Sequence, residues 1–103
     1  MMRDKKRYLL VETTAKIEGD PKSFGAMLYR EIIRCIGESS YHRVNPRLVK
    51  LIGENHFIIK SSLEGTGQLI LALALIKRIG DTDTAFYTLK SSGTIKALGK
   101  SMD

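Results

Sequence analysis

The sequence is poor in tryptophan, cysteine and proline: its 103 residues include no tryptophan, one cysteine and two prolines. The single cysteine, Cys35, excludes a disulfide within the chain and is typical of a reducing compartment. Its place on the apolar stripe of a predicted helix indicates a buried, inert thiol. The two histidines, His42 and His56, do not lie at ligand spacing with each other or with Cys35, so we expect no metal site. No nucleophile–histidine–acid set stands out, so we also expect no catalytic residues.

Long hydrophobic runs are missing as well. The longest apolar run, from Leu69 to Ile76, has eight residues, whereas a membrane span needs about 20. The basic N-terminus is followed by too few apolar residues for a signal peptide. We therefore expect a cytoplasmic protein that forms one domain over residues 1–103. We expect no membrane among its partners.

Acidic residues are also scarce relative to basic ones, with 11 Asp and Glu against 17 Lys and Arg and a net charge of +6. This charge favours an anionic partner, either nucleic acid or an acidic membrane surface. Many small soluble domains are simply basic, and charge alone leaves that alternative open.

Hydrophobic periodicity and turn residues predict the elements of the fold. Asp20 is a good N-cap, Pro21 fits the first helical position, and Gly37 is a plausible helix end. The segment from Glu38 to Pro46 is a polar connection. The predicted strands are Tyr8 to Thr14, Arg47 to Ile52, His56 to Ser61 and Thr84 to Lys90; the predicted helices are Pro21 to Ile36, Glu64 or Thr66 to Ile79 before Gly80, and about 92 to 102; a turn spans Asp81 to Asp83.

The order β-α-β-β-α-β with an additional C-terminal helix predicts an α+β class protein, a ferredoxin-like or RRM-like α/β sandwich. Two helices would cover one face of a four-stranded antiparallel sheet. This fold hosts many functions, so function must be argued from sites.

The second helix is apolar on nearly all sides, although packing on a sheet needs only one stripe. The extra face predicts contact with a neighbouring helix, a partner protein or a second copy of the chain. We assign the partner contact to Leu69, Leu73 and Ile76.

Cationic residues gather at both ends of the sequence. An N-terminal basic arm, residues 1–7, carries Arg3, Lys5, Lys6 and Arg7 and adjoins Tyr8, which suits phosphate contact and base stacking. A solvated terminus is the alternative. If the first and last strands pair, the two basic ends share one half of the sheet, and strand direction decides which edge each occupies.

The second cationic segment is SSGTIK. Ser92 is placed to cap the last helix, while Gly93 and Thr94 leave N–H groups accessible to a phosphate. Lys90, Lys96 and Lys100 add charge. An ordinary strand-to-helix turn is the alternative, and the spacing of a nucleotide-binding P-loop is absent.

These two segments resemble a known family. RDKKRYLLVE, Arg3 to Glu12, is similar to the opening signature of protein component 2 of archaeal ribonuclease P, a family that includes a eukaryotic Pop-type subunit. SGTIKAL, Ser92 to Leu98, resembles its closing motif. The positions that match the family are Arg3, Lys5, Lys6, Arg7 and Tyr8 in the first motif, and Ser92, Gly93, Thr94, Ile95 and Lys96 in the second. All of them except Ile95, together with Lys90 and Lys100, are the expected RNA-binding residues.

The resemblance implies a subunit of a tRNA 5′-maturation endoribonuclease, a hydrolase that removes the 5′ leader of precursor tRNA. It implies that the catalyst is the ribonuclease P RNA with its own Mg²⁺, and that this chain binds no cofactor. It further implies a partnership with protein component 3, a barrel-like subunit, and only indirect contact with precursor tRNA. Self-association is a further possibility for the apolar helix face.

Three alternatives remain at the level of sequence. A stand-alone RRM-type domain would bind single-stranded RNA, with Phe57 as the one aromatic of its third strand. A small enzyme such as an acylphosphatase would need an arginine-bearing phosphate loop after the first strand, which AKIEGDPK lacks. A ligand-binding ferredoxin-like module would bind a small metabolite instead of RNA.

Overall fold

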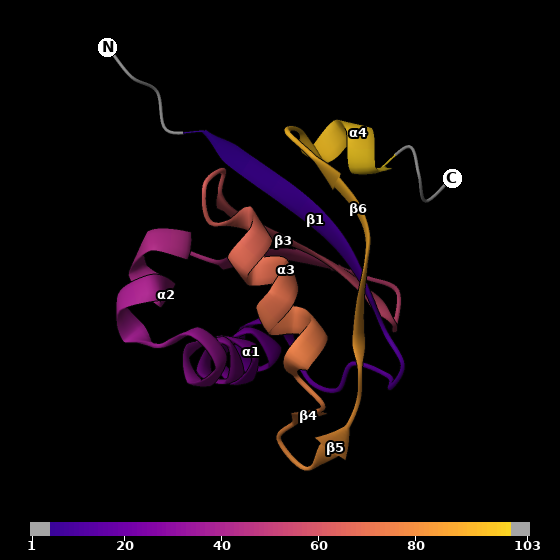
Figure 1. Ribbon diagram of the computed structural model, residues 1–103. Helices are drawn as coiled ribbons and strands as arrows, with labels where there is room; N and C mark the ends of the chain where they lie inside the picture. The colour runs from indigo at the N-terminus through magenta and orange to yellow at the C-terminus, as the bar shows by residue number, and fades with distance from the viewer. Residues whose placement is uncertain (1–4, 100–103) are drawn as a thin grey trace.

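The computed structural model describes residues 5–99, which form a sheet with helices on both of its faces (Figure 1). Four strands pair in the order β2-β3-β1-β6, and β4 pairs with β5 in a separate small hairpin. The elements are β1 (Lys6–Thr13), α1 (Pro21–Ile36), α2 (Glu38–Val44), β2 (Arg47–Ile52), β3 (His56–Ser62), α3 (Thr66–Leu75), β4 (Arg78–Ile79), β5 (Thr82–Asp83), β6 (Phe86–Ser92) and α4 (Ile95–Gly99).

The four-stranded sheet is antiparallel throughout, as the sequence predicted. Its order places β1 in the interior between β3 and β6, and leaves β2 and β6 as edge strands. This is the strand order of a ferredoxin-like fold, with α2, the β4–β5 hairpin and α4 added to the basic pattern.

The main core lies between the sheet and the helices α1 and α3. Because side chains alternate along a strand, Leu9, Val11 and Phe57 point to this side, where they meet Leu28 of α1 and Leu69 of α3. The rings of Phe24 and Phe86 pack edge-on against Phe57, with centroids 5.4 and 5.7 Å away. Phe57 is fully buried and cannot stack on a nucleic-acid base, which removes the one aromatic of the third strand from the RRM-type alternative.

The opposite face of the sheet carries a second, smaller apolar cluster. Leu10 of β1 and Ile58 of β3 pack there against Leu98 of α4, with Tyr8 and Ile95 at its border. α4 therefore covers part of the face that α1 and α3 leave open, near the N-terminal end of β1 (Figure 1).

Two predicted boundaries of α1 are confirmed. The Asp20 side chain accepts a hydrogen bond from the Ser23 N–H at 2.7 Å, and Gly37 ends the helix with a φ of +85°. The predicted polar connection from Glu38 to Pro46 is wrong, because α2 follows directly. Its C-terminal Val44 is buried in the core, and the packing of that side chain stabilises a short helix whose other residues are mostly polar.

The predicted end of the second helix is also wrong. α3 stops at Leu75, and Ile76 has an extended conformation instead of continuing to Ile79. Ile76 and Ile79 are both buried, and Gly80 forms the turn of the β4–β5 hairpin with a φ of +59°. Both isoleucines therefore belong to the core although neither lies in α3.

Cys35 lies on the solvent side of α1, so its predicted burial is wrong. Partial desolvation, and secondarily the Glu31 carboxylate, raise the pKa of the Cys35 thiol. The thiol is thus exposed but protonated at neutral pH, which agrees with the predicted lack of reactivity. None of the helices within residues 5–99 combines the length and apolarity needed to pass through a bilayer.

Candidate nucleic-acid interface

The two cationic motifs from opposite ends of the sequence adjoin in the folded chain. β1 and β6 run antiparallel, and their paired residues include Tyr8 with Ser92 and Leu10 with Lys90. Neighbouring strands lie about 4.8 Å apart, so the start of β1 and the end of β6 occupy the same end of the sheet. Strand direction, which the sequence left open, thus brings the motifs together.

The Arg7 side chain of the first motif lies close to Gly93 of the second. Nη1 of the Arg7 guanidinium is 3.9 Å from the position that a Cβ would take on Gly93. Lys5 and Lys6 are exposed beside them, as are Lys90 and Lys96. Arg3 and Lys100 lie outside the described residues.

The turn between β6 and α4 is organised by its own side chains. The Ser92 hydroxyl accepts a hydrogen bond from the Thr94 N–H at 3.2 Å, and the Thr94 hydroxyl accepts one from the Ala97 N–H at 3.3 Å. Since α4 begins at Ile95, Thr94 caps this helix, and the prediction that Ser92 does so is wrong. Two amides of the turn are therefore occupied within the protein, and the exposed Lys96 is the clearer candidate for phosphate contact.

Tyr8 is held in place on the α4 side of the sheet. Its ring is half-buried and packs against the cluster of Leu10, Ile58 and Leu98. Packing on this cluster limits the area of the ring that a base could cover, so Tyr8 is better suited to an edge or hydroxyl contact than to full stacking.

Beside these motifs lies a cationic feature that the sequence analysis missed, an open groove of about 910 Å³ that we call the basic groove. It runs between the start of β1, the end of α2, the start of β2 and the end of β3. Its lining residues are Lys5, Lys6, His42, Arg43, Asn45, Arg47, Lys60, Ser61, Ser62, Leu63 and Glu64. Five of them are lysine or arginine and one is acidic. Lys5 and Lys6 belong to the N-terminal basic arm, but Arg43, Arg47 and Lys60 are dispersed along the sequence, so no dense charge run indicated the whole groove.

The predicted partner contact on α3 requires correction. Leu69, Leu73 and Ile76 are 0%, 1% and 3% exposed and belong to the main core. These side chains fill the space against the sheet and α1 and cannot meet another protein in the folded state. The apolar side chains that α3 presents to solvent are Leu71 and Leu75, which are 59% and 57% exposed.

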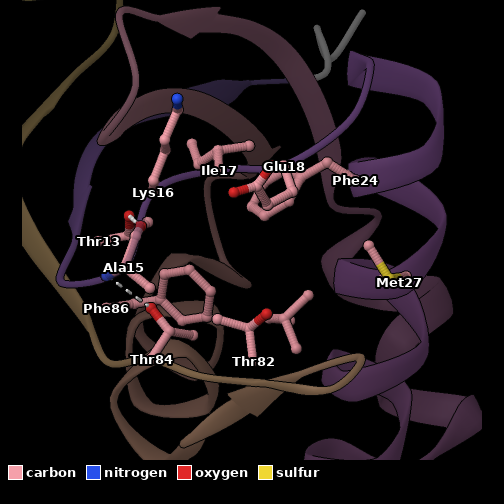
Figure 2. Close-up of a pocket in the computed structure, with 11 residues that line it drawn as sticks. Thr13, Ala15, Lys16, Ile17, Glu18, Phe24, Met27, Thr82, Thr84 and Phe86 are labelled. Carbon is pink, nitrogen blue, oxygen red and sulfur yellow. Dashed lines mark hydrogen bonds between the residues drawn. The ribbon is translucent and has the colours of Figure 1, made fainter.

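A small cavity lies at the other end of the sheet, between the β1–α1 connection, α1 and the β4–β5 hairpin (Figure 2). Phe24 and Met27 form one wall, and the Ala15 N–H donates a hydrogen bond to the Thr84 hydroxyl at 3.3 Å across another. Its volume is about 40 Å³, far below the several hundred Å³ of pockets that hold metabolites. This cavity therefore does not favour the small-ligand alternative.

Comparison with known proteins bears on nearly the whole chain. The model of the Rpp14/Pop5 family matches residues 7–102. No curated protein matches the sequence. The matched range includes both cationic motifs, apart from the residues before Arg7.

Proposed function

The chain belongs to the Rpp14/Pop5 family of ribonuclease P protein subunits, and from this membership we propose that it binds the ribonuclease P RNA and supports that RNA in removing the 5′ leader of precursor tRNA. The observation that carries the RNA-binding role is the pairing of Tyr8 with Ser92, which unites the two cationic motifs at one end of the sheet. A surface of this kind suits a polyanion.

The proposed mechanism is electrostatic. Lys5, Lys6, Arg7, Lys90 and Lys96 neutralise phosphates of the folded RNA, with Arg3 and Lys100 as further contacts from the ends of the sequence. Ser92, Gly93, Thr94 and Tyr8 contribute by shaping this surface. Neutralisation lowers the repulsion between RNA segments, so the catalytic fold and its Mg²⁺ sites form at lower ionic strength. Hydrolysis of the phosphodiester bond is assigned to the RNA, and this chain supplies no catalytic group or cofactor.

The protein partner is proposed to be component 3, the barrel-like subunit that family membership leads us to expect. Because Leu69, Leu73 and Ile76 are buried, we assign this contact to Leu71 and Leu75 instead. These two exposed apolar side chains would be removed from water by a bound partner. Precursor tRNA is then reached through the assembled particle, in the cytoplasm, where a lone thiol stays reduced.

Reconstitution tests the proposal. A ribonuclease P RNA of the same source is combined with component 3 and precursor tRNA at moderate Mg²⁺, and 5′-leader cleavage is measured with and without this chain. We expect cleavage at moderate Mg²⁺ to depend on the chain. At higher Mg²⁺ concentrations, cleavage should depend on the chain less. Cleavage that is identical without the chain at every Mg²⁺ concentration would reject the proposal.

A further inference from the structure

We propose that the basic groove is a second RNA-binding site, which holds the sugar-phosphate backbone of a double-helical RNA segment. This inference rests on the proposed function for the identity of the polymer as RNA. It adds a site whose principal residues, Arg43, Arg47 and Lys60, lie outside both terminal motifs.

The groove continues, across the sheet, the surface formed by the two cationic motifs. Arg47 of β2 pairs with Lys60 of β3, Lys60 pairs with Tyr8 of β1, and Tyr8 pairs with Ser92 of β6. These four residues occupy one row that crosses all four strands. With strands about 4.8 Å apart, the row spans roughly 14 Å, so a polymer rather than a single phosphate matches its length.

The cations of the groove lack acidic partners among the described residues. The ion pairs within residues 5–99 join Lys16 to Glu54, Arg34 to Glu31, His56 to Glu12 and Arg78 to Asp83, and none of these residues lines the groove. Glu64, the only acidic residue of the lining within this described range, takes part in none of these pairs. A surface with five cations and one carboxylate attracts a polyanion strongly.

Two of the cations are placed where they repel each other. Arg47 and Lys60 lie directly opposite on neighbouring strands, a position at which like charges destabilise a sheet. The Arg47 guanidinium is nevertheless held in place. Its Nη1 donates a hydrogen bond to the Pro46 carbonyl at 3.0 Å, and its Cζ lies over the Tyr29 ring, 6.0 Å from the ring centroid. Phosphates bound between Arg47 and Lys60 would offset this repulsion, so the pairing of two cations is consistent with a site for a polyanion.

The walls of the groove are fixed relative to each other. The Ser62 hydroxyl donates to the Arg43 carbonyl at 2.8 Å and accepts from the Gly65 N–H at 3.1 Å, which joins β3, the end of α2 and the start of α3. The Ser61 hydroxyl donates to the Ser62 carbonyl at 3.0 Å. The serines thus serve the framework, and the lysines and arginines are the groups that face a ligand.

The absence of aromatic rings in the lining indicates which form of RNA fits. The lining residues include no phenylalanine, tyrosine or tryptophan, and the ring of nearby Tyr8 packs against the α4 cluster. Proteins that hold single strands rely on base stacking, which this groove does not offer. Double-helical RNA is recognised through its phosphates and its shape, which the groove does offer.

The test compares the salt dependence of RNA binding by the full chain and its variants. The ligand is a fluorescent RNA duplex of about 16 base pairs, and the competitor is an unpaired RNA with the same number of phosphates. Arg47→Ala/Lys60→Ala and Arg43→Ala/Lys60→Ala each remove two groove cations that lie outside both terminal motifs. The charge-matched control is Lys22→Ala/Lys77→Ala, which removes two exposed lysines that lie outside the groove.

We expect each groove variant to lower the slope of log K against log salt by up to about 2, since each duplex phosphate contact contributes roughly 0.9. The control should leave the slope within about 0.5 of the wild-type value. Wild-type binding should favour the duplex over the unpaired strand and vary little with sequence.

Two results would contradict the proposal that the groove binds duplex RNA. One is that both groove variants have the same slope of log K against log salt as the control; the other is that the wild type clearly prefers the unpaired strand. The melting temperatures of all variants are measured in parallel, so a folding defect in one groove pair is recognised and the other pair decides. If reconstituted cleavage depends on the wild-type chain while the groove variants retain its slope, the inference fails and the proposed function stands. If the groove variants bind the duplex with lower slopes but the wild-type chain adds nothing to cleavage, the proposed function fails instead.

Discussion

The hydroxyl oxygen of Tyr29 accepts a hydrogen bond from the backbone N–H of Leu48 at 2.7 Å. This bond joins α1 to the edge strand β2, at the point where the pairing of β2 with β3 shifts between Leu48 and Lys50. An edge strand has outward N–H groups that the sheet does not use, and Tyr29 satisfies one of them. It also lies beneath the Arg47 guanidinium, so the same side chain supports the strand and the first cation of the groove.

Tyr29→Phe removes this bond and leaves the ring in place. We expect a loss of about 1 kcal/mol in the free energy of unfolding, measured by urea denaturation, together with faster hydrogen exchange at the Leu48 amide. Tyr87→Phe on the exposed surface of β6 is the control and should change neither quantity. Unchanged exchange at Leu48 would show that Tyr29 does not hold β2.

Gly65→Ala tests the close approach of α3 to α2. A Cβ on Gly65 would lie 2.7 Å from the Cα of Val44, a backbone atom that cannot move away easily. We expect a loss of about 1 to 3 kcal/mol in the free energy of unfolding. Gly67→Ala, two residues further on, meets no atom within 4 Å and should instead stabilise the helix by up to about 1 kcal/mol. Equal effects of the two changes would contradict the packing described here.

Comparison of Leu71→Asp with Leu73→Asp distinguishes a partner-binding role on α3 from a role in the core. Leu73 is buried, so its replacement by a charged residue should cost more than about 4 kcal/mol and abolish cooperative unfolding. Leu71 is exposed, so its variant should fold, with a loss of no more than about 1 kcal/mol. We expect the Leu71 variant to lose binding to component 3 in a pull-down assay. Retained binding would show that component 3 contacts another surface. If the Leu71 variant instead loses a homodimer that the wild type forms, the exposed face of α3 binds a second copy of the chain.

Thr94→Ala and Lys96→Ala distinguish the helix cap from the phosphate contact. Thr94→Ala removes the acceptor of the Ala97 N–H and should lower the free energy of unfolding by about 1 kcal/mol, with little effect on the salt slope of RNA binding. Lys96→Ala should leave stability within about 0.5 kcal/mol and flatten the slope by roughly 0.9. An unchanged slope for Lys96→Ala would remove this lysine from the contact surface.

The pH dependence of stability reports on the cap of α1. Hydrogen bonds from Ser23, chiefly its backbone N–H, lower the pKa of the Asp20 carboxyl below its ordinary value. A carboxyl with a lower pKa in the folded state stabilises the protein at pH above about 4, and this contribution disappears as the pH falls through the folded pKa. Asp20→Asn keeps a capping oxygen without the titration. Its melting temperature should therefore fall less steeply than that of the wild type between about pH 5 and pH 3. Parallel curves for the two proteins would show that the cap is not ionised.

Much of the fold was accessible from the sequence because its signals are local. Asp20, Pro21 and Gly37 mark the limits of α1, and short runs of aromatic, branched and Thr residues between turn residues mark the strands. α2 was missed because one buried side chain, Val44, decides its position. The orientation of α3 was missed for a different reason. A helix rich in leucine and alanine on all sides has no polar stripe to set its phase, so the sequence does not say whether Leu71 or Leu73 faces the sheet.

The candidate site divides in the same way. The N-terminal motif was visible as a run of cations and the second as a Gly-Thr turn with lysines nearby, and the predicted strand order placed them near each other. The basic groove was not visible as a whole, because Arg43, Arg47 and Lys60 come from α2, β2 and β3 and only the fold brings them beside Lys5 and Lys6. Cations dispersed in this way form no dense run along the chain.

The interior position of β1 has a consequence for synthesis. β1 leaves the ribosome before β6, although β6 is one of its two neighbours in the sheet. Until residues 86–92 emerge, β1 keeps an open edge that can pair with another chain. The row from Arg47 to Ser92 is incomplete in every shorter nascent chain. A truncated product that ends before β6 would thus lack the joined RNA surface and would expose an edge of β1 that can aggregate.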